Sequence, residues 1–197
     1  MTMTLDLQPG FDDPVTAAQQ TFRAALDAMA RPGTLGTADA CSGVPDGLSP
    51  AMARLLLTLA DADTPVWLPA GVPESARAFL RFHCGCPLVA TPADAAFVVV
   101  PAGFAAPALA ECAQGDPAFP DRSATLLLEL PALDGGHALL LRGPGIESTQ
   151  VLAPAGLPGD FVMQWRANHA RFPLGVDLLL TSGSVFCALP RTTRVED

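Results

Sequence analysis

The segment SPAMARLLLTLADADTPVWL, residues 49–68, places a helix and a strand in direct succession. Ser49 and Pro50 are typical of a helix start, because serine caps the free N–H groups and proline fits the first turn. The apolar residues that follow recur on one helical face, at Met52, Leu55, Leu56 and Leu59. A loop of Asp, Ala, Thr and Pro then leads into a short strand predicted at residues 66–68. This alternation indicates an α/β protein.

The same alternation extends through the first half of the chain. Asp13 and Pro14 predict the start of a helix whose apolar positions run to Met29, and Pro32 and Gly33 end it. Two more helices are predicted at 73–82 and 107–113. Short apolar runs with β-branched residues and proline borders predict buried strands at 88–90 and 97–100.

Hairpins dominate from Ser123 onward. The pattern predicts a hairpin turn at 134–136, a helix that follows Asp160, a loop at 154–159, and a polar tail at 190–194. The strands predicted in this half are 125–130, 138–142, 176–181 and 185–189, and the helix is 161–171. No linker divides the chain. We therefore expect residues 1–197 to form a single three-layer α/β domain with a mixed β-sheet flanked by helices.

The composition excludes several classes of function. The chain of 197 residues has 11 basic residues, all arginine, against 20 acidic ones, and its net charge of −9 disfavours a nucleic-acid partner. Without lysine it can neither form a Schiff base with pyridoxal phosphate nor supply the lysine of a P-loop. No apolar run approaches the roughly 20 residues needed to cross a membrane, and the N-terminus lacks signal-peptide features, so we expect a cytoplasmic protein.

The cysteines form the most conspicuous cluster of possible metal ligands. The chain has five, and an odd number without a signal peptide favours reduced thiols. His83-Cys84-Gly85-Cys86 could be completed by other residues, namely Cys112, Cys187, His137 or His169. Only one residue separates the two thiols, however, whereas zinc knuckles use two. A helix end that runs into a strand, with small buried cysteines in the core, is the better interpretation, and we predict no metal site.

No catalytic constellation emerges from the remaining motifs. Ser182 lies between two predicted strands and lacks the first glycine of a nucleophile elbow, so a hairpin turn is the better interpretation. Gly143-Pro144-Gly145 lacks the third glycine of a dinucleotide fingerprint and is interpreted as a turn. We therefore predict no catalytic residues.

One part of the chain has the chemistry of an anion site. Arg191, Thr192, Thr193 and Arg194 combine two guanidiniums with two hydroxyls, which are charge-assisted and neutral donors to an oxyanion. Arg81 and His83 could contribute to the same pocket. A solvated tail, or an arm that docks on another subunit, explains the first segment without any ligand.

Several segments along nearly the full length resemble the PhnH family, the H subunit of the carbon–phosphorus lyase system for phosphonate breakdown. The most specific are Asp63-Thr64-Pro65-Val66-Trp67-Leu68 and Pro190-Arg191-Thr192-Thr193. Other matching segments are Met29-x-x-Pro32-Gly33, Arg81-Phe82-His83, Leu141-x-Gly143-Pro144-Gly145-Ile146 and Phe172-Pro173-Leu174-Gly175.

The resemblance implies membership of a multisubunit enzyme. PhnH-like proteins act with PhnG, PhnI, PhnJ and PhnL, and the G, H, I and L subunits convert MgATP and an alkylphosphonate into ribose 1-alkylphosphonate 5-triphosphate and adenine. The family implies a homodimer in isolation and a fold like the large domain of pyridoxal-phosphate-dependent transferases that has lost the cofactor. It supplies no catalytic residues, so we expect a non-catalytic structural or assembly subunit that binds no cofactor of its own. The alternative is a stand-alone anion- or nucleotide-binding protein that uses residues 191–194.

Overall fold

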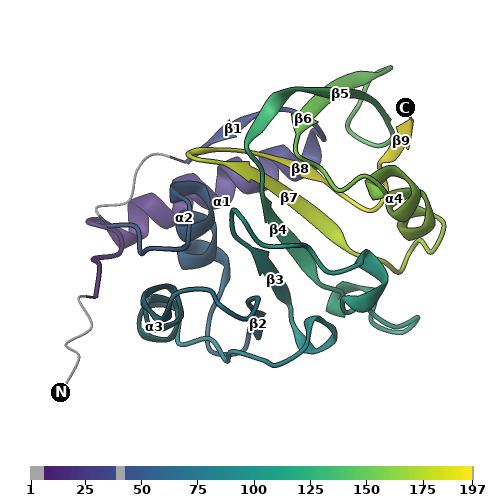
Figure 1. Cartoon of the computed structure of the whole chain (residues 1–197). Helices are drawn as coiled ribbons and strands as arrows, with labels where there is room; N and C mark the ends of the chain where they lie inside the picture. The colour runs from purple at the N-terminus through teal and green to yellow at the C-terminus, as the bar shows by residue number, and fades with distance from the viewer. Residues whose placement is uncertain (1–6, 39–42, 197) are drawn as a thin grey trace.

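Two β-sheets organise the computed structural model, which describes residues 7–38 and 43–196 (Figure 1). The larger sheet has the strand order β1-β8-β7-β4-β3-β2. Its strands are β1 (Gly36–Thr37), β2 (Val66–Trp67), β3 (Phe97–Val100), β4 (Thr125–Glu129), β7 (Asp177–Ser182) and β8 (Val185–Leu189). Strands β2, β3, β4 and β7 are parallel, whereas β8 and β1 are antiparallel to their neighbours. The predicted α/β fold with a mixed sheet is therefore confirmed.

Three helices cover one face of this sheet: α1 (Pro14–Ala30), α2 (Pro50–Leu59) and α3 (Glu74–His83). The predicted caps explain where two of them start. Asp13 accepts a hydrogen bond from the Thr16 N–H at 3.2 Å, and Ser49 accepts one from the Met52 N–H at 3.3 Å. Their buried side chains pack against sheet residues that point to this face, namely Val99, Leu127, Leu179 and Ala188.

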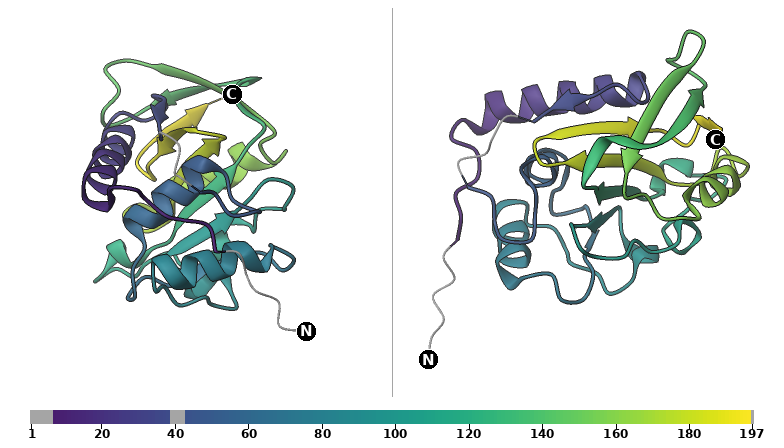
Figure 2. Two further views of the ribbon diagram at one scale, coloured as in Figure 1. Left: turned by 90° about the vertical axis from the view of Figure 1, so that its left-hand side faces the viewer. Right: turned by 45° about the horizontal axis from the view of Figure 1, so that its top comes forward.

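The opposite face carries helix α4 (Phe161–His169) and the smaller sheet, which has the order β6-β5-β9 (Figure 2). The strands of this sheet are β5 (Ala132–Arg142), β6 (Gln150–Ala155) and β9 (Arg194–Glu196). Successive residues of a strand point to opposite faces, so the sheet residues buried here alternate with those under α2: they are Val98, Leu126, Leu128, Leu178 and Leu180. Both faces of the central strands are buried, which explains their continuous apolar sequences.

The predicted hairpin turn at 134–136 is wrong. Strand β5 runs through Gly135 and Gly136 with shifts in register and pairs with β6, while β4 belongs to the other sheet. Gly136 is needed for a close approach of the two strands and not for a turn. A Cβ at Gly136 would lie 2.1 Å from the Pro154 carbonyl oxygen, so only glycine lets the two strands meet there.

Four further predictions are corrected. Residues 88–90 form one isolated bridge, between Leu88 and Val66, in place of a strand. The helix predicted at 107–113 is a single 3₁₀ turn, η2 (Leu109–Glu111), because the chain becomes extended at Cys112. The predicted polar tail folds back, since Arg194–Glu196 pairs with β5 as strand β9, and β6 includes the first two residues of the predicted 154–159 loop.

No helix in the described part of the chain is both long and apolar enough to cross a membrane. Cys41 and the first residues of the N-terminal segment, on which the cysteine and signal-peptide predictions partly rest, lie outside the described residues.

Candidate functional site

Arg191, the first arginine of the predicted anion site, is fully engaged inside the protein. Its backbone N–H and its Nε donate to Asp177 Oδ1 at 2.7 and 3.1 Å, and its Nη2 donates to the same carboxylate. Nη1 donates to the backbone oxygens of Pro120 and Pro173 at 3.0 and 3.2 Å, and Nη2 also reaches Ser123 Oγ. The two charged side chains are only 13% and 15% exposed. The Arg191 guanidinium therefore fixes the fold and offers no donor to a ligand.

Thr193 also points into the protein. It is completely buried, its N–H donates to the Pro190 carbonyl at 2.8 Å, and its carbonyl accepts a 2.8 Å hydrogen bond from the indole Nε1 of Trp165. These contacts and those of Arg191 hold residues 190–193 as a fixed turn between β8 and β9.

Thr192 and Arg194 have a different environment. Both line an open pocket of about 410 Å³ between the ends of β5, β9 and α4. The other lining residues are Arg142, Gly143, Pro144, His169 and Phe172. Of the four tail residues in the predicted anion site, the structure thus brings these two to a surface that a ligand could reach.

Arg81 and His83 lie elsewhere. Both belong to helix α3, which covers one face of the larger sheet, whereas β9 and α4 lie on the opposite face (Figure 1). Arg81 Nη1 donates to Glu74 Oε1 at 2.7 Å, and His83 Nε2 donates to the backbone oxygen of Gln8 at 3.0 Å. The structure therefore separates the two halves of the predicted anion site.

Cys84 and Cys86 follow helix α3. Cys86 belongs to the core that α2 and α3 help to form, and Cys84 packs against it. Cys84 donates its S–H toward Leu56 O at 3.5 Å and Cys86 toward Leu80 O at 3.8 Å, with Cys86 buried. The neighbouring Cys86 side chain, together with burial, raises the pKa of the Cys84 thiol, because its ionised form would lie beside a second sulfur in an apolar site. No group of three or more potential ligands that could hold a metal ion occurs among residues 7–38 and 43–196.

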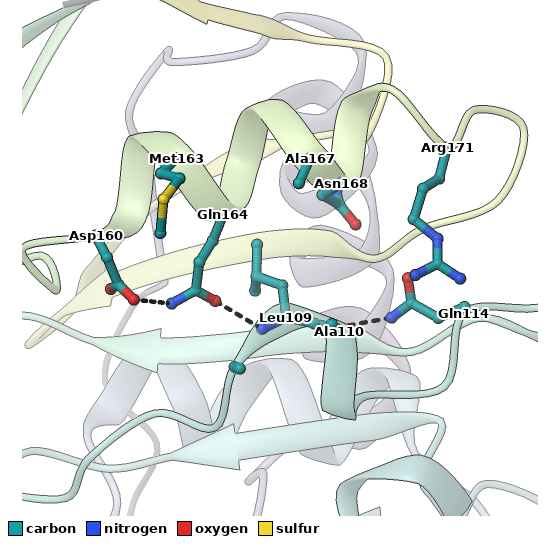
Figure 3. A pocket seen from close by; sticks show the side chains of 10 residues that line it. Leu109, Ala110, Gln114, Asp160, Met163, Gln164, Ala167, Asn168 and Arg171 are labelled. Atoms are coloured by element: carbon teal, nitrogen blue, oxygen red, sulfur yellow. Dashed lines mark hydrogen bonds between the residues drawn. The ribbon is translucent and has the colours of Figure 1, made fainter.

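A second pocket, of about 370 Å³, lies between η2 and α4 (Figure 3). Several of its polar groups are paired: Gln164 accepts from the Leu109 N–H at 2.8 Å and donates to Asp160 at 2.8 Å. Gln114 donates to the carbonyl oxygens of Leu109 and Cys112. The lining includes neither a histidine nor a thiol. These pairings hold η2 onto α4, and the pocket offers mainly apolar contacts.

Sequence reasoning missed Arg142, His169 and Phe172 as possible partners of Arg194. They come from the end of β5, the end of α4 and the loop that follows. Their proximity depends on the pairing of β9 with β5, and a three-residue strand in a polar segment gives no periodic signal in a sequence.

Comparison with known proteins places the whole chain in one family. The sequence model of the family described as "Bacterial phosphonate metabolism protein (PhnH)" matches residues 9–196. A Rhizobium meliloti (strain 1021) protein named "Alpha-D-ribose 1-methylphosphonate 5-triphosphate synthase subunit PhnH" is 44% identical over 187 residues, which is 94% of each chain.

A second relative, from Stutzerimonas stutzeri, is named "Putative C-P lyase subunit protein HtxG". It is 41% identical over 76 residues, or 39% of each chain. The resemblance inferred from the sequence is therefore confirmed over nearly the entire length, and the chain belongs to the PhnH family of bacterial phosphonate metabolism proteins.

Proposed function

We propose that this chain is a subunit of an α-D-ribose 1-methylphosphonate 5-triphosphate synthase in organophosphonate catabolism, and that its role there is structural. The observation that carries the proposal is the 44% identity to a synthase subunit over 94% of both chains. Identity at this level along the whole length supports a shared assembly as well as a shared fold.

The non-catalytic role is supported by the chemistry of the candidate residues. Arg191 of the predicted site is paired with Asp177, and Gln164 and Asp160 in the pocket beside α4 are paired with each other. Catalysis by acid–base or nucleophilic groups requires such groups to face a substrate. We infer that MgATP and the phosphonate react on partner subunits, and that this chain binds neither pyridoxal phosphate nor another cofactor. The likeness to pyridoxal-phosphate-dependent transferases stays part of this proposal.

Helix α1 supports a role in assembly. Three large apolar side chains on its outer surface are exposed: Val15 (69%), Phe22 (52%) and Leu26 (59%). They recur at intervals of seven and four residues, so they share one side of the helix. Exposed apolar stripes of this kind are commonly covered by another chain. A second copy of this chain, and the G, I, J or L subunits of the synthase and lyase, are the partners that we propose.

Co-purification tests the proposal. The tagged chain, coexpressed with its G, I, J and L partners, should elute in one assembly whose mass includes them. The isolated chain should release no adenine from MgATP and methylphosphonate. Phe22→Glu should weaken assembly or dimerisation, whereas Gln20→Glu, which adds the same charge at an exposed position of the same helix, should not. A chain that elutes without any partner, or that turns over alone, would overturn the proposal.

A further inference from the structure

Two arginines face each other across the smaller sheet. Arg142 ends β5 and Arg194 begins β9, and the two residues are direct partners in this antiparallel pair. Side chains at such positions lie on the same face about 5 Å apart at Cβ, and like charges there destabilise the pair. The chain has only 11 basic residues against 20 acidic ones. Placing two of them opposite each other favours an anion between them over a purely structural role.

The donors of both guanidiniums are available. Within the described residues, the Arg194 guanidinium makes no hydrogen bond or ion pair, and the Arg142 guanidinium has one distant carboxylate neighbour, with 3.8 Å between its Nε and Glu196 Oε2. The side chains of that pair are 51% and 54% exposed, so water screens the interaction strongly. An anion that enters the pocket need not displace a strong ion pair.

His169 adds a ring nitrogen to the same pocket. Its Nδ1 donates to the backbone oxygen of Arg191 at 2.9 Å, since a carbonyl can only accept. This hydrogen bond fixes the tautomer of the neutral ring and leaves Nε2 as the nitrogen open to a ligand. Nε2 can accept from a protonated oxyanion, or donate to an ionised one when the ring carries a second proton.

The backbone around these groups is held in place before any ligand arrives. Arg191 and Trp165 secure the turn that carries Thr192, through the Asp177 carboxylate and the Thr193 carbonyl. Gly143, with φ of +143°, packs so closely that an added Cβ would lie 3.0 Å from the Thr192 carbonyl oxygen. A site supported in this way keeps its donors in position, which lowers the entropic cost of binding.

The pocket also has an apolar wall. Phe172 is 58% exposed and lines it together with Pro144, and the volume of about 410 Å³ is typical of a site for a small molecule. A carboxylate has two oxygens and one charge, which one guanidinium satisfies. Two guanidiniums and an imidazole match a group with three terminal oxygens and up to two negative charges.

We propose that Arg142, Arg194 and His169 form a binding site for a small organic phosphate or phosphonate, whose organic group lies on Phe172. The site is a property of the isolated chain, so it does not depend on the assembly role proposed above.

Calorimetric titration of the purified full chain at low ionic strength tests the site, with phenylphosphonate, inorganic phosphate and benzoate as probes. Phenylphosphonate should bind with 1:1 stoichiometry and more tightly than either of the others. Benzoate tests the need for the third oxygen and second charge, and inorganic phosphate tests the need for the organic group. Phe172→Ala should reduce the affinity for phenylphosphonate to near that for inorganic phosphate.

Charge variants make the test specific. Arg142→Gln and Arg194→Gln should each weaken phenylphosphonate binding about tenfold, the usual effect of losing a charge-assisted hydrogen bond. Glu196→Gln should strengthen binding about twofold, because it removes the nearby carboxylate. Arg23→Gln, which removes the same charge from an exposed position of α1, should leave the affinity unchanged.

Thermal unfolding of the same variants separates binding from folding. Arg194→Gln should melt at the wild-type temperature or slightly above it, since it relieves a like-charge pair. The proposal is overturned if phenylphosphonate gives no saturable binding, or if Arg194→Gln and Arg23→Gln bind it equally. Equal affinity for inorganic phosphate would overturn the role assigned to Phe172.

Discussion

Arg191 and Asp177 lock the last turn of the chain onto the centre of the larger sheet. Asp177 begins strand β7, and its carboxylate accepts from the backbone N–H, Nε and Nη2 of Arg191. The remaining guanidinium donors bind two carbonyls and the Ser123 hydroxyl. Because these partners come from the start of β7, the loop at Pro173 and the segment 120–123, one arginine joins segments that lie 14 to 71 residues before it.

Replacing Arg191 with alanine should therefore destabilise the fold. The change leaves a mostly buried Asp177 carboxylate with only a backbone donor, and breaking such a pair costs about 3–5 kcal/mol. Urea unfolding measures this cost. Arg31→Ala is the matched control, because its ion pair with Asp27 is more than half exposed and should contribute only about 0.5 kcal/mol. Equal effects of the two substitutions would contradict the structural role of Arg191.

The sequence correctly identified residues 190–194 as chemically unusual but could not show what they contact. Two arginines and two threonines are as compatible with a structural turn as with an anion site. The choice between these two interpretations depends on Asp177, which lies 14 residues before Arg191. The two residues come together only through the pairing of β7 with β8. Local features, in contrast, were predicted well: Asp13 and Ser49 cap the helices that their sequences indicate.

The smaller sheet shows where pattern reasoning fails. Its register depends on glycine packing, as at Gly136 against Pro154, and on a strand of only three residues, Arg194–Glu196. Neither gives the alternating apolar pattern by which strands are predicted. The pocket that joins Arg142 to Arg194 was missed for the same reason.

Glu129, at the carboxyl end of β4, should also contribute strongly to the stability of the fold. Its carboxylate accepts from Ser49 Oγ at 2.6 Å, Thr181 Oγ1 at 2.5 Å and the Gly183 N–H at 2.8 Å. It thereby ties the start of α2 to the β7–β8 hairpin. Glu129→Ala leaves these donors without their acceptor and should cost about 3 kcal/mol, measured by urea unfolding.

Amide hydrogen exchange tests the contact between Glu129 and the β7–β8 hairpin at a single residue. The Gly183 amide should exchange faster in Glu129→Ala than in the wild type, because its acceptor is lost. Glu111→Ala serves as control: among the described residues its exposed carboxylate accepts only from the Ala108 N–H, so the loss of stability should stay below about 1 kcal/mol. Unchanged protection of Gly183 would refute this account.

Thr193→Val should stabilise the protein. The Thr193 hydroxyl is completely buried and has no hydrogen-bond partner among the described residues, which is unfavourable relative to water. Valine has nearly the same shape, and replacing the hydroxyl by a methyl group should gain about 1 kcal/mol in the free energy of unfolding. Thr181→Val is the control with the opposite sign, since that buried hydroxyl donates to Glu129. A loss of stability in Thr193→Val would disprove the prediction.

The buried thiols should resist alkylation in the native protein. Burial raises the pKa of the Cys187 thiol to about 12, and burial together with the nearby Glu111 carboxylate raises that of Cys112 to about 11. The thiolate is the reactive form, and at pH 8 it would make up about one part in 10⁴ of Cys187 and one part in 10³ of Cys112. Iodoacetamide should therefore modify both far more slowly in the native protein than in the unfolded chain.

The rate at which iodoacetamide modifies a thiol of the native protein should also rise with pH. While the pH stays below about 11, each unit of increase raises the thiolate fraction of native Cys112 tenfold, so its slow native labelling should accelerate in proportion. Mass spectrometry of digested protein resolves each site, and the same reaction in urea gives the rate for unfolded chains. Because Cys187 lies in the middle of β8 and is fully buried, its labelling should follow global unfolding. Labelling of native Cys187 at the unfolded rate would show that β8 opens far more readily than its packing allows.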